Sequence, residues 1–421
     1  MSRYKLGARL AILFLGAISL AAAVSGCSQA PSDVVLEPAN TTYYEGARVL
    51  VGNGEVIEDA VFSVVDGVFA AVGSSNAVDL PSGVSAVDLR GKTVMPAIVD
   101  AHVHLSTSRD ALTQDLRRRA EQGISAALSL GSDGEDVPLE MRDELMPGAA
   151  RYLSAGRGIT MPEPGRTEVP HWVTSEAQAR QAVRDEAARD VNFIKIWVDD
   201  RNGQYEKLSA ELYSAIIDEA HQHNLKVFAH IFALEDAKGL LRAGIDVFAH
   251  GVRDQDIDDE FVALIRQRPE VILVPNLPGR GVPTDLSWLA TSMADEEFLQ
   301  LQAGNVERLE VQAAHGIQAR NLARLSAAGM TIAMGTDGNT FWAPHVEMED
   351  MVAAGMAAAD VIVSATQNSA NAVGLDDTGT IQAGKRADFI VLDANPLEAI
   401  ENTRRISAVY LAGGLVDRSG R

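Results

Sequence analysis

Six polar side chains of this chain have the types and spacing of metal ligands, and the first two form a pair. His102 and His104 stand two residues apart, directly after the apolar stretch 94–99. In an extended chain residues i and i+2 project to the same side, so both imidazoles can bind one metal ion, at about 2.0–2.1 Å for zinc. Asp100, just upstream, could orient a ligand from behind. Histidines two apart also occur by chance, so the pair needs further ligands to support the prediction.

The other four candidate ligands each lie in or directly after a separate apolar run. They are Lys195 within 192–197, His230 after 226–229, His250 after 246–249, and Asp337 after 332–336. A single histidine at a strand end is more often a structural hydrogen-bonding residue than a ligand. The joint pattern, four such residues on four separate runs together with the histidine pair, favours a metal site over unrelated structural roles.

Lys195 is the unusual member, because a lysine within an apolar strand has to be buried. An unpaired ammonium is expensive to bury, so one interpretation is an ion pair with a buried acid. The other is a lysine that has reacted with CO₂ to give a carbamate, an anion whose two oxygens can bridge two cations. Burial lowers the pKa of a lysine and so favours that reaction. A carbamate at Lys195 would indicate two metal ions rather than one.

The elements that must position these side chains form an alternating pattern. Eight short apolar runs are typical of parallel strands buried on both faces: 94–99, 124–130, 151–159, 191–198, 225–231, 245–249, 270–275 and 331–335. Helical patterns lie between them, for example at 175–189, 209–222 and 234–243. Eight strand–helix alternations favour an α/β fold of the (β/α)₈ barrel type, whose chemistry lies at the carboxyl ends of the strands.

The two flanks of the barrel have a different pattern. Residues 60–72 contain two alternating strands around the turn Asp66-Gly67, and 387–392 and 406–416 repeat this style near the other end of the chain. The economical arrangement is one small β-sandwich domain built from both termini. We therefore predict a β-sandwich from residues 42–95 and 376–421, with the metal-dependent barrel at 96–375 inserted between them.

The N-terminus predicts export. Three basic residues precede the apolar run 10–24, which is short for a membrane span and typical of a signal peptide. The run ends in Val24-Ser25-Gly26-Cys27, which resembles a bacterial lipobox, and a secretory signal with a chance cysteine is the alternative. The resemblance implies a lipoprotein signal peptide at 1–26, lipid on Cys27 and a tether at 27–41. Ser28 after the cysteine implies the outer membrane, facing the periplasm.

Composition narrows the partners and the ligand types. Cys27 is the only cysteine, which excludes disulfides within the chain and cysteine-based zinc sites, so a metal must be held by His, Asp, Glu or Lys-derived ligands. The formal charge of −22 argues against nucleic acid and against adhesion to anionic lipid. Membrane attachment would therefore depend on the N-terminal lipid anchor. The sequence leaves open whether the protein forms a homo-oligomer.

Three stretches carry a family resemblance. The motif MPAIVDAHVH at 95–104 resembles the first-strand signature of the amidohydrolase superfamily, and GTDG at 335–338 resembles its eighth-strand signature. The stretch TGTIQAGKRADF at 378–389 is similar to the family's return into its β-sandwich, so the resemblance covers about 42–418. The wording FIKI at 193–196 resembles the binuclear subtype, in its imidazolonepropionase-like and Xaa-Pro or Xaa-Arg dipeptidase branch.

The resemblance implies a role for each matching position. His102, His104 and Asp337 would bind the more buried of two divalent metal ions, with zinc as the expected metal. His230 and His250 would bind the second ion, and carboxylated Lys195 and a hydroxide would bridge the two. Two cations lower the pKa of a bridging water and polarise the scissile carbonyl. Asp337 would be the catalytic residue that takes the proton and passes it to the leaving amine.

Loops on the same barrel face supply candidate substrate contacts. The five candidates are Arg157, His171, Tyr205, Arg280 and His345, and a surface or structural role is the alternative for each. Asp199-Asp200, after the fourth predicted strand, would favour a basic or neutral substrate over an anion.

These features together predict a hydrolase that cleaves a carbon–nitrogen bond in an amide, small peptide or cyclic amide. A second hypothesis keeps the metal centre and changes the substrate to a lactone, carbamate or phosphotriester. A mononuclear deaminase would leave Lys195 without a metal role. A third hypothesis is a surface lipoprotein that has lost the chemistry, against which the retention of six ligand-type residues argues.

Overall fold

The computed structural model of the chain describes residues 41–134, 136–142, 144–166 and 168–419. The predicted signal peptide, Cys27 and the predicted tether up to residue 40 lie outside the described residues. Thr41, the last residue of the predicted tether, is instead the first residue of strand β1 (Thr41–Leu50). Within the described ranges no helix combines the length and apolar character that crossing a membrane requires.

Eight parallel strands form the barrel, as the apolar runs predicted. They are β6 (Ile98–Val103), β7 (Ile124–Ser129), β8 (Arg151–Ser154), β11 (Ile194–Val198), β12 (Val227–Ile231), β13 (Val247–Phe248), β14 (Ile272–Leu273) and β15 (Thr331–Ile332). The short strands β9 (Ile159–Thr160) and β10 (His171–Trp172) follow β8, and β9 pairs with β11. Backbone hydrogen bonds from Ala101 to Met334 (3.0 Å) and from Asn192 to Ser154 (2.9 Å) join the remaining strand edges.

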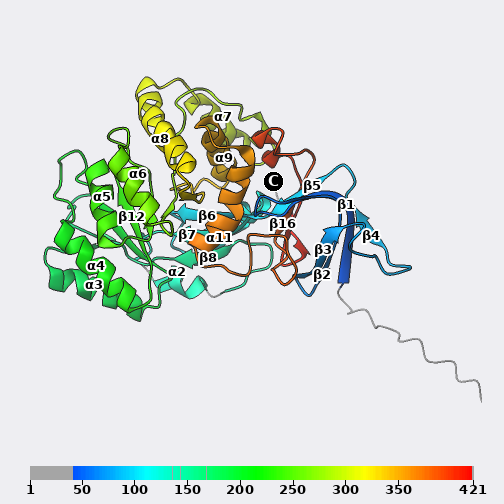
Figure 1. Ribbon diagram of the computed structural model, residues 1–421, viewed down its shortest axis with the longest axis horizontal. Coiled ribbons are helices and arrows are strands. Elements are labelled where there is room, and N and C mark those ends of the chain that lie inside the picture. The colour runs from blue at the N-terminus through cyan, green and yellow to red at the C-terminus, as the bar shows by residue number, and fades with distance from the viewer. Residues whose placement is uncertain (1–40, 135, 143, 167, 420–421) are drawn as a thin grey trace, which may run out of the picture. The chain divides into compact units, whose positions relative to one another are not determined.

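Helices connect the strands on the outside of the barrel (Figure 1). They are α1 (Arg109–Glu121), α2 (Asp136–Met141), α3 (Glu176–Ala188), α4 (Ala210–Gln222), α5 (Leu234–Ala243), α6 (Asp259–Gln267), α7 (Asp295–Gly304), α8 (Leu309–Ala327), α9 (Ala343–Ala353), α10 (Ala358–Val363) and α11 (Ser369–Ala372). The hydroxyls of Ser175 and Ser209 cap α3 and α4 by accepting from backbone N–H groups. Gly244 ends α5 at φ 99°, a left-handed conformation that glycine adopts without strain.

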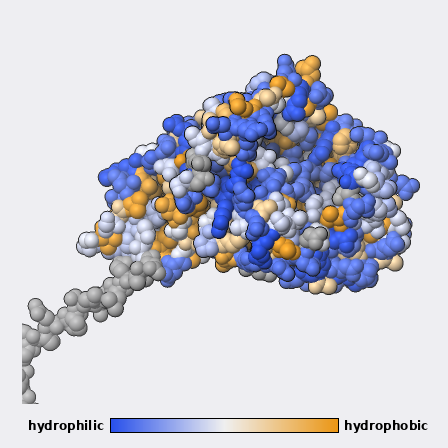
Figure 2. All heavy atoms as spheres, turned by 180° about the vertical axis from the view of Figure 1, so that it is seen from behind, coloured by the Kyte–Doolittle hydropathy of each residue, from blue (hydrophilic) through white to orange (hydrophobic). Residues whose placement is uncertain are grey.

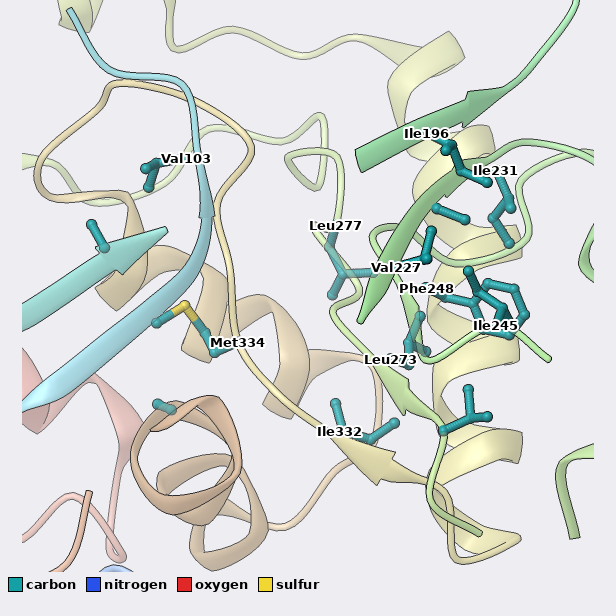
Figure 3. Packing of buried hydrophobic residues seen from close by; sticks show 14 of the residues in the cluster. Val103, Ile196, Val227, Ile231, Ile245, Phe248, Leu273, Leu277, Ile332 and Met334 are labelled. Carbon is teal, nitrogen blue, oxygen red and sulfur yellow. The ribbon is translucent and has the colours of Figure 1, made fainter. Parts of the chain in front are cut away.

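Alternation along the strands decides which side chains enter the barrel. Ile194, Ile196 and Val198 of β11 belong to the large apolar cluster between strands and helices, together with outward residues of β12 such as Val227 and Ile231 (Figure 3). Lys195 and Trp197 therefore point inward, and the register places Trp197 directly opposite His230. A shift of one residue in the pairing of β11 would move its apolar side chains from the outer face to the barrel interior. The apolar outer face therefore fixes the register that points Lys195 inward.

The predicted run 94–99 is two strands rather than one. Strand β5 (Thr93–Pro96) leaves the barrel and pairs with β1 and with β16 (Phe389–Leu392). Ala97 alone separates β5 from β6, and its backbone N–H donates to Asp388. The apolar run is continuous because both strands are buried, and periodicity alone could not reveal the change of sheet.

Strands from both ends of the chain build a second sheet, beside the barrel (Figure 1). Its order is β18-β17-β16-β5-β1-β2-β3, with β4 (Ala86–Asp88) beside β1; β2 is Val56–Val65, β3 Val68–Ser74, β17 Ile406–Leu411 and β18 Gly414–Leu415. The rings of Tyr44, Phe62, Phe69, Phe389 and Tyr410 pack together within it. The two halves of the predicted sandwich are thus one hydrogen-bonded sheet that closes over an aromatic cluster.

One face of the molecule shows how polar residues are distributed. The face in Figure 2 is mostly hydrophilic, with apolar residues in separate areas. Such a face is usual for a globular chain.

Candidate metal centre

Three histidines converge on one carboxylate at the carboxyl ends of the barrel strands. The Nε2 atoms of His102 and His104 lie 3.1 and 3.0 Å from Asp337 Oδ1, and His250 Nε2 lies 3.5 Å from Asp337 Oδ2. The possible ligand atoms of His102, His250 and Asp337 all lie within 4.8 Å of one another. The His230 ring joins the group, with its centroid 4.5 Å from that of His250. The structure therefore brings together residues that the sequence places on four separate strands.

Polar neighbours hold the far nitrogens of the first two histidines. His102 Nδ1 lies 2.9 Å from Asn276 Oδ1, and His104 Nδ1 lies 3.2 Å from the Ser132 hydroxyl. Because a carbonyl oxygen only accepts, His102 carries its proton on Nδ1 and keeps the Nε2 lone pair for another partner. Such outer contacts fix the orientation of metal-binding imidazoles.

His230 is held the other way round. Its Nε2 donates to Asp199 Oδ2 at 2.9 Å, and the same carboxylate oxygen accepts from the Arg201 guanidinium at 2.6 Å. Nδ1 is consequently the nitrogen of this ring that remains for a metal. Arg201 and His230 hold the pKa of Asp199 below its usual range, although burial acts against this.

Lys195 lies fully buried within this group. Its Nζ has no hydrogen-bond partner among the described residues and lies 5.4 Å from the centre of the Trp197 ring. The side chain fits because Gly131 has no Cβ: an added one would lie 2.8 Å from Lys195 Cγ and 2.6 Å from the Trp197 ring. Burial lowers the pKa of Lys195 to about 7, so a large fraction of the amine is neutral near pH 7. A neutral amine is the form that reacts with CO₂.

The histidines are also held neutral. Burial lowers the pKa of His102 to about 4 and that of His230 to about 3, and it holds the pKa of His250 well below its usual value. The pKa of Asp337 is lowered, because the attraction of His102 and His250 outweighs the effect of burial. Neutral imidazoles and an ionised carboxylate are the protonation states that bind metal.

Backbone strain marks two positions of this centre. Asp337 and Asn276 have φ values of 54° and 45°, which non-glycine residues adopt rarely. Asp100, predicted to support a ligand, accepts from the Thr336 hydroxyl (2.8 Å) and from Arg119 (3.1 Å) rather than from an imidazole ring. It thus positions the segment that carries Asp337.

Of the five predicted substrate contacts, three make hydrogen bonds or ion pairs that stabilise loops. Arg157 donates to the backbone oxygen of Val169 at 2.5 Å, and His171 lies 2.8 Å from the buried Glu186 carboxylate. The Tyr205 hydroxyl donates to the Pro164 oxygen at 3.1 Å. All three stabilise the long segment between β8 and β11 or its junction with the next loop.

The other two candidates lie near α9. Arg280 pairs with the buried Asp350 at 2.7 Å and borders a cavity of about 360 Å³ between its own loop, α7 and α9. His345 is fully buried, with its ring nitrogens 3.1 Å from the Thr403 hydroxyl and 3.0 Å from the backbone oxygen of Gln122. This placement leaves no ring nitrogen of His345 for a substrate.

Sequence reasoning missed four side chains that the structure adds to the centre: Ser132, Asn276, Arg201 and Arg253. Asn276 follows an apolar run just as the ligands do, so the polar residue at the strand end was an available signal. Arg201 and Arg253 lie in loops, two residues after Asp199 and three after His250, where no periodic pattern applies.

The fold agrees with comparisons to known proteins. A family model described as "Amidohydrolase family" matches residues 93–416. Imidazolonepropionase of Deinococcus radiodurans is 27% identical over 390 residues, covering 86% of this chain and 93% of the relative. Ochratoxinase of Aspergillus niger is 24% identical over 447 residues, covering 91% and 88%.

A solved structure has the same fold and a similar sequence identity to this chain. A Bifidobacterium longum protein described as a prolidase superposes with a TM-score of 0.75 at 28% identity, covering 91% of this chain and 96% of that one. The family model spans well over half of the sequence and includes every candidate ligand. The chain belongs to the amidohydrolase family.

Proposed function

We propose that the protein hydrolyses a carbon–nitrogen bond in an amide, small peptide or cyclic amide, with two divalent metal ions bound at this centre. The observation that carries the proposal is the buried Lys195 Nζ, which has no hydrogen-bond partner in the described part of the chain and lies beside the histidines gathered around Asp337. A lone buried amine is costly for stability alone, whereas a carbamate there has two oxygens for two cations. Relatives named imidazolonepropionase and prolidase support the choice of bond.

The donor set fits such ions. His102, His104 and Asp337 would hold one ion, His230 through Nδ1 and His250 would hold the other, and carboxylated Lys195 would join them. Imidazole and carboxylate ligands suit zinc, although manganese and iron also accept them. The neutral imidazoles and the ionised Asp337 need no change of protonation before binding.

The chain's own contribution to hydrolysis centres on Asp337. When bound, the two ions supply an activated water and polarise the scissile carbonyl. Asp337 has two carboxylate oxygens, so one can ligate while the other takes the proton from the attacking water. The same oxygen then returns the proton to the leaving nitrogen. Asn276 and Ser132 keep the two neighbouring imidazoles in place meanwhile.

Metal analysis tests the centre. We expect about two metal ions per chain in the protein as purified with metal and bicarbonate, as in other two-metal sites. The Lys195→Ala variant should lose most of this metal while keeping its fold. One ion in both proteins would contradict the bridging carbamate.

A matched substrate panel tests the bond. Amide, lactone, carbamate and phosphotriester substrates are compared on one metal-loaded preparation, and we expect amides to give the highest kcat/KM. A preference for esters or phosphotriesters would replace the proposed reaction. Activity that survives removal of the metal would contradict the metal-dependent reaction. No activity on any member of the panel would favour the non-catalytic hypothesis.

We propose separately that Cys27 carries lipid and holds the protein at a membrane, on the basis of the signal-like segment before it. Fractionation of cells that produce wild type or Cys27→Ser tests this. The variant should leave the membrane fraction. Its continued presence there would contradict the lipid anchor.

A further inference from the structure

Glu347 is a buried acid in the middle of α9, and its carboxyl group has a different kind of partner from that of its neighbour. Glu349, two residues further along the helix, is also buried and pairs with Arg404. Glu347 makes no ion pair within the described parts of the chain. Its Oε1 instead accepts from the backbone N–H of Leu277 at 3.0 Å. A buried carboxyl group of an outer helix is thus bound to the loop after β14.

The loop that Glu347 contacts carries the support of His102. Asn276 directly precedes Leu277, and its Oδ1 lies 2.9 Å from His102 Nδ1. The φ of Asn276 is 45°, a left-handed value that costs free energy in a residue with a Cβ. Pro275, on the other side, has no N–H with which to bond to the sheet. The conformation of Asn276 therefore has to be held from the side of Leu277.

Leu277 is fixed through both its side chain and its backbone. The side chain belongs to the large apolar cluster between strands and helices (Figure 3), and the N–H donates to Glu347. The N–H of Leu277 lies in the same planar peptide group as the carbonyl of Asn276. A hydrogen bond to this N–H therefore limits rotation about the ψ angle of Asn276.

The surroundings of Glu347 favour its neutral form. Burial raises the pKa of Glu347 well above its usual value, although the N–H of Leu277 acts against this. The negative charges of Asp350, Asp100 and Asp337 raise it further. A protonated carboxyl group keeps a carbonyl oxygen that accepts one N–H, as the amide of glutamine also does. This side chain thus supplies an acceptor at a fixed position rather than a charge.

We propose that Glu347 is a positioning residue of the metal centre: its carbonyl oxygen holds the peptide group between Asn276 and Leu277, so that the Asn276 amide oxygen faces His102. His102 then keeps its proton on Nδ1 and its Nε2 lone pair for a metal ion. The proposal rests on the metal centre of the proposed function and adds to it a side chain from an outer helix, which acts through the loop.

The metal affinity of three variants tests the role of the acceptor. Glu347→Met keeps the length of the side chain and removes the acceptor, Glu347→Asp withdraws the acceptor by one carbon, and Glu347→Gln keeps it. We expect affinity to fall about tenfold in the first two, as for other outer contacts of metal ligands, and to stay within about twofold of wild type in the third. Competition with a chromogenic chelator measures these affinities. An equal fall in Glu347→Gln and Glu347→Met would overturn the proposal.

Glu349→Met is the matched control. It makes the same change in a buried acid of the same helix, but one that accepts from Arg404 and not from the loop after β14. Metal affinity should stay at the wild-type value in this variant, even where the free energy of unfolding falls. Equal losses of affinity in Glu349→Met and Glu347→Met would mean that the packing of α9 is responsible, and would contradict a specific role of Glu347.

A double-mutant cycle shows whether Glu347 acts through Asn276. Changes at two successive links of one chain of contacts are not additive, whereas changes at independent sites are. Glu347→Met should lower metal affinity about tenfold in the wild-type background but less than about twofold in the Asn276→Ala background. Additive losses would show that the two residues act independently and would rule out the proposed route.

The tautomer of His102 in the metal-free protein separates this role from the proposed function. Nitrogen chemical shifts of the histidine rings, assigned with His102→Gln, report which ring nitrogen carries the proton. Wild type and Glu347→Gln should carry it on Nδ1, and Glu347→Met should show both tautomers. That result in a protein that binds no metal would refute the metal centre and keep the positioning role. Metal binding with the same tautomer in wild type and Glu347→Met would refute the positioning role alone.

Discussion

The two sides of the candidate centre differ in which of their groups lack partners. On the side of β6 and β15, His102 and His104 lie near Asp337 at one nitrogen and contact an amide or hydroxyl group at the other. The buried groups without a hydrogen bond on that side, among the described residues, are the neutral nitrogens His102 Nε2 and Asn276 Nδ2. On the side of β11 to β13, the buried nitrogens that lack an acceptor among the described residues belong to the basic side chains Lys195, Arg201 and Arg253.

This difference assigns separate duties to the two sides. On the side of β6 and β15, an amide and a hydroxyl group fix the orientation of the two imidazoles. On the side of β11 to β13, buried basic groups without acceptors among the described residues favour the binding of groups that supply acceptors. Substitutions on the first side should therefore affect turnover and metal geometry, and those on the second should affect what is taken up.

The largest effect is expected at Asp337. Asp337→Asn keeps the size of the side chain and removes the proton acceptor, so kcat should fall by roughly 10²–10⁴-fold, the usual contribution of a general base. The free energy of unfolding of the metal-loaded protein should change much less. Steady-state kinetics and denaturant unfolding measure the two effects, and an unchanged kcat would remove Asp337 as the proton acceptor.

The next effect is expected where Lys195 is packed. Gly131→Ala places a Cβ 2.8 Å from Lys195 Cγ at a φ of 88°, so the variant combines crowding with strain. We expect a loss of about 3 kcal/mol in the free energy of unfolding, with reduced metal content. Gly203→Ala has a similar φ of 75° and open space around it, so it measures the strain alone. Equal losses of metal in both variants would show that crowding of Lys195 is irrelevant.

A smaller effect is expected at the support of His102. Asn276→Ala removes the acceptor for Nδ1 and should weaken metal affinity by about 10–100-fold, as for other outer contacts of metal ligands. Asn339→Ala is the matched control, because Asn339 follows β15 and donates to the half-buried Asp115 rather than supporting a candidate ligand. Competition with a chromogenic chelator measures the affinities. Similar metal affinities in the two variants would mean that Asn276 does not set the orientation of the His102 ring.

The smallest effect concerns a buried histidine outside the centre. Burial lowers the pKa of His345 to about 4, so between pH 6.5 and 4 the unfolded chain binds a proton that the folded chain does not. This difference should remove about 2 kcal/mol of stability between pH 7 and pH 5. His345→Gln should show a shallower loss over that range when both proteins are metal-free. Identical slopes in denaturant unfolding would mean that His345 does not contribute.

Much of the barrel was predictable because burial on both faces leaves a continuous apolar run. That the candidate ligands would lie together was predictable, because charged or polar residues interrupt or end such runs, as Lys195 and Asp337 do. Contacts in loops were not predictable: Arg201 and Arg253 follow no period, so the pairing of Asp199 with Arg201 could not be expected from the sequence. The strand break at Ala97 was missed because burial is the same on its two sides.

That break has a consequence for how the protein is made. Strand β5 lies between β1 and β16, and the residue after Ala97 begins the strand that carries His102. Residues 389–392 follow the whole barrel in the sequence, so β5 lacks one of its two neighbours until both the barrel and β16 are present. The amino end of the strand that carries His102 is thus anchored by a segment from beyond the barrel. A product that stops before β16 would lack this anchor.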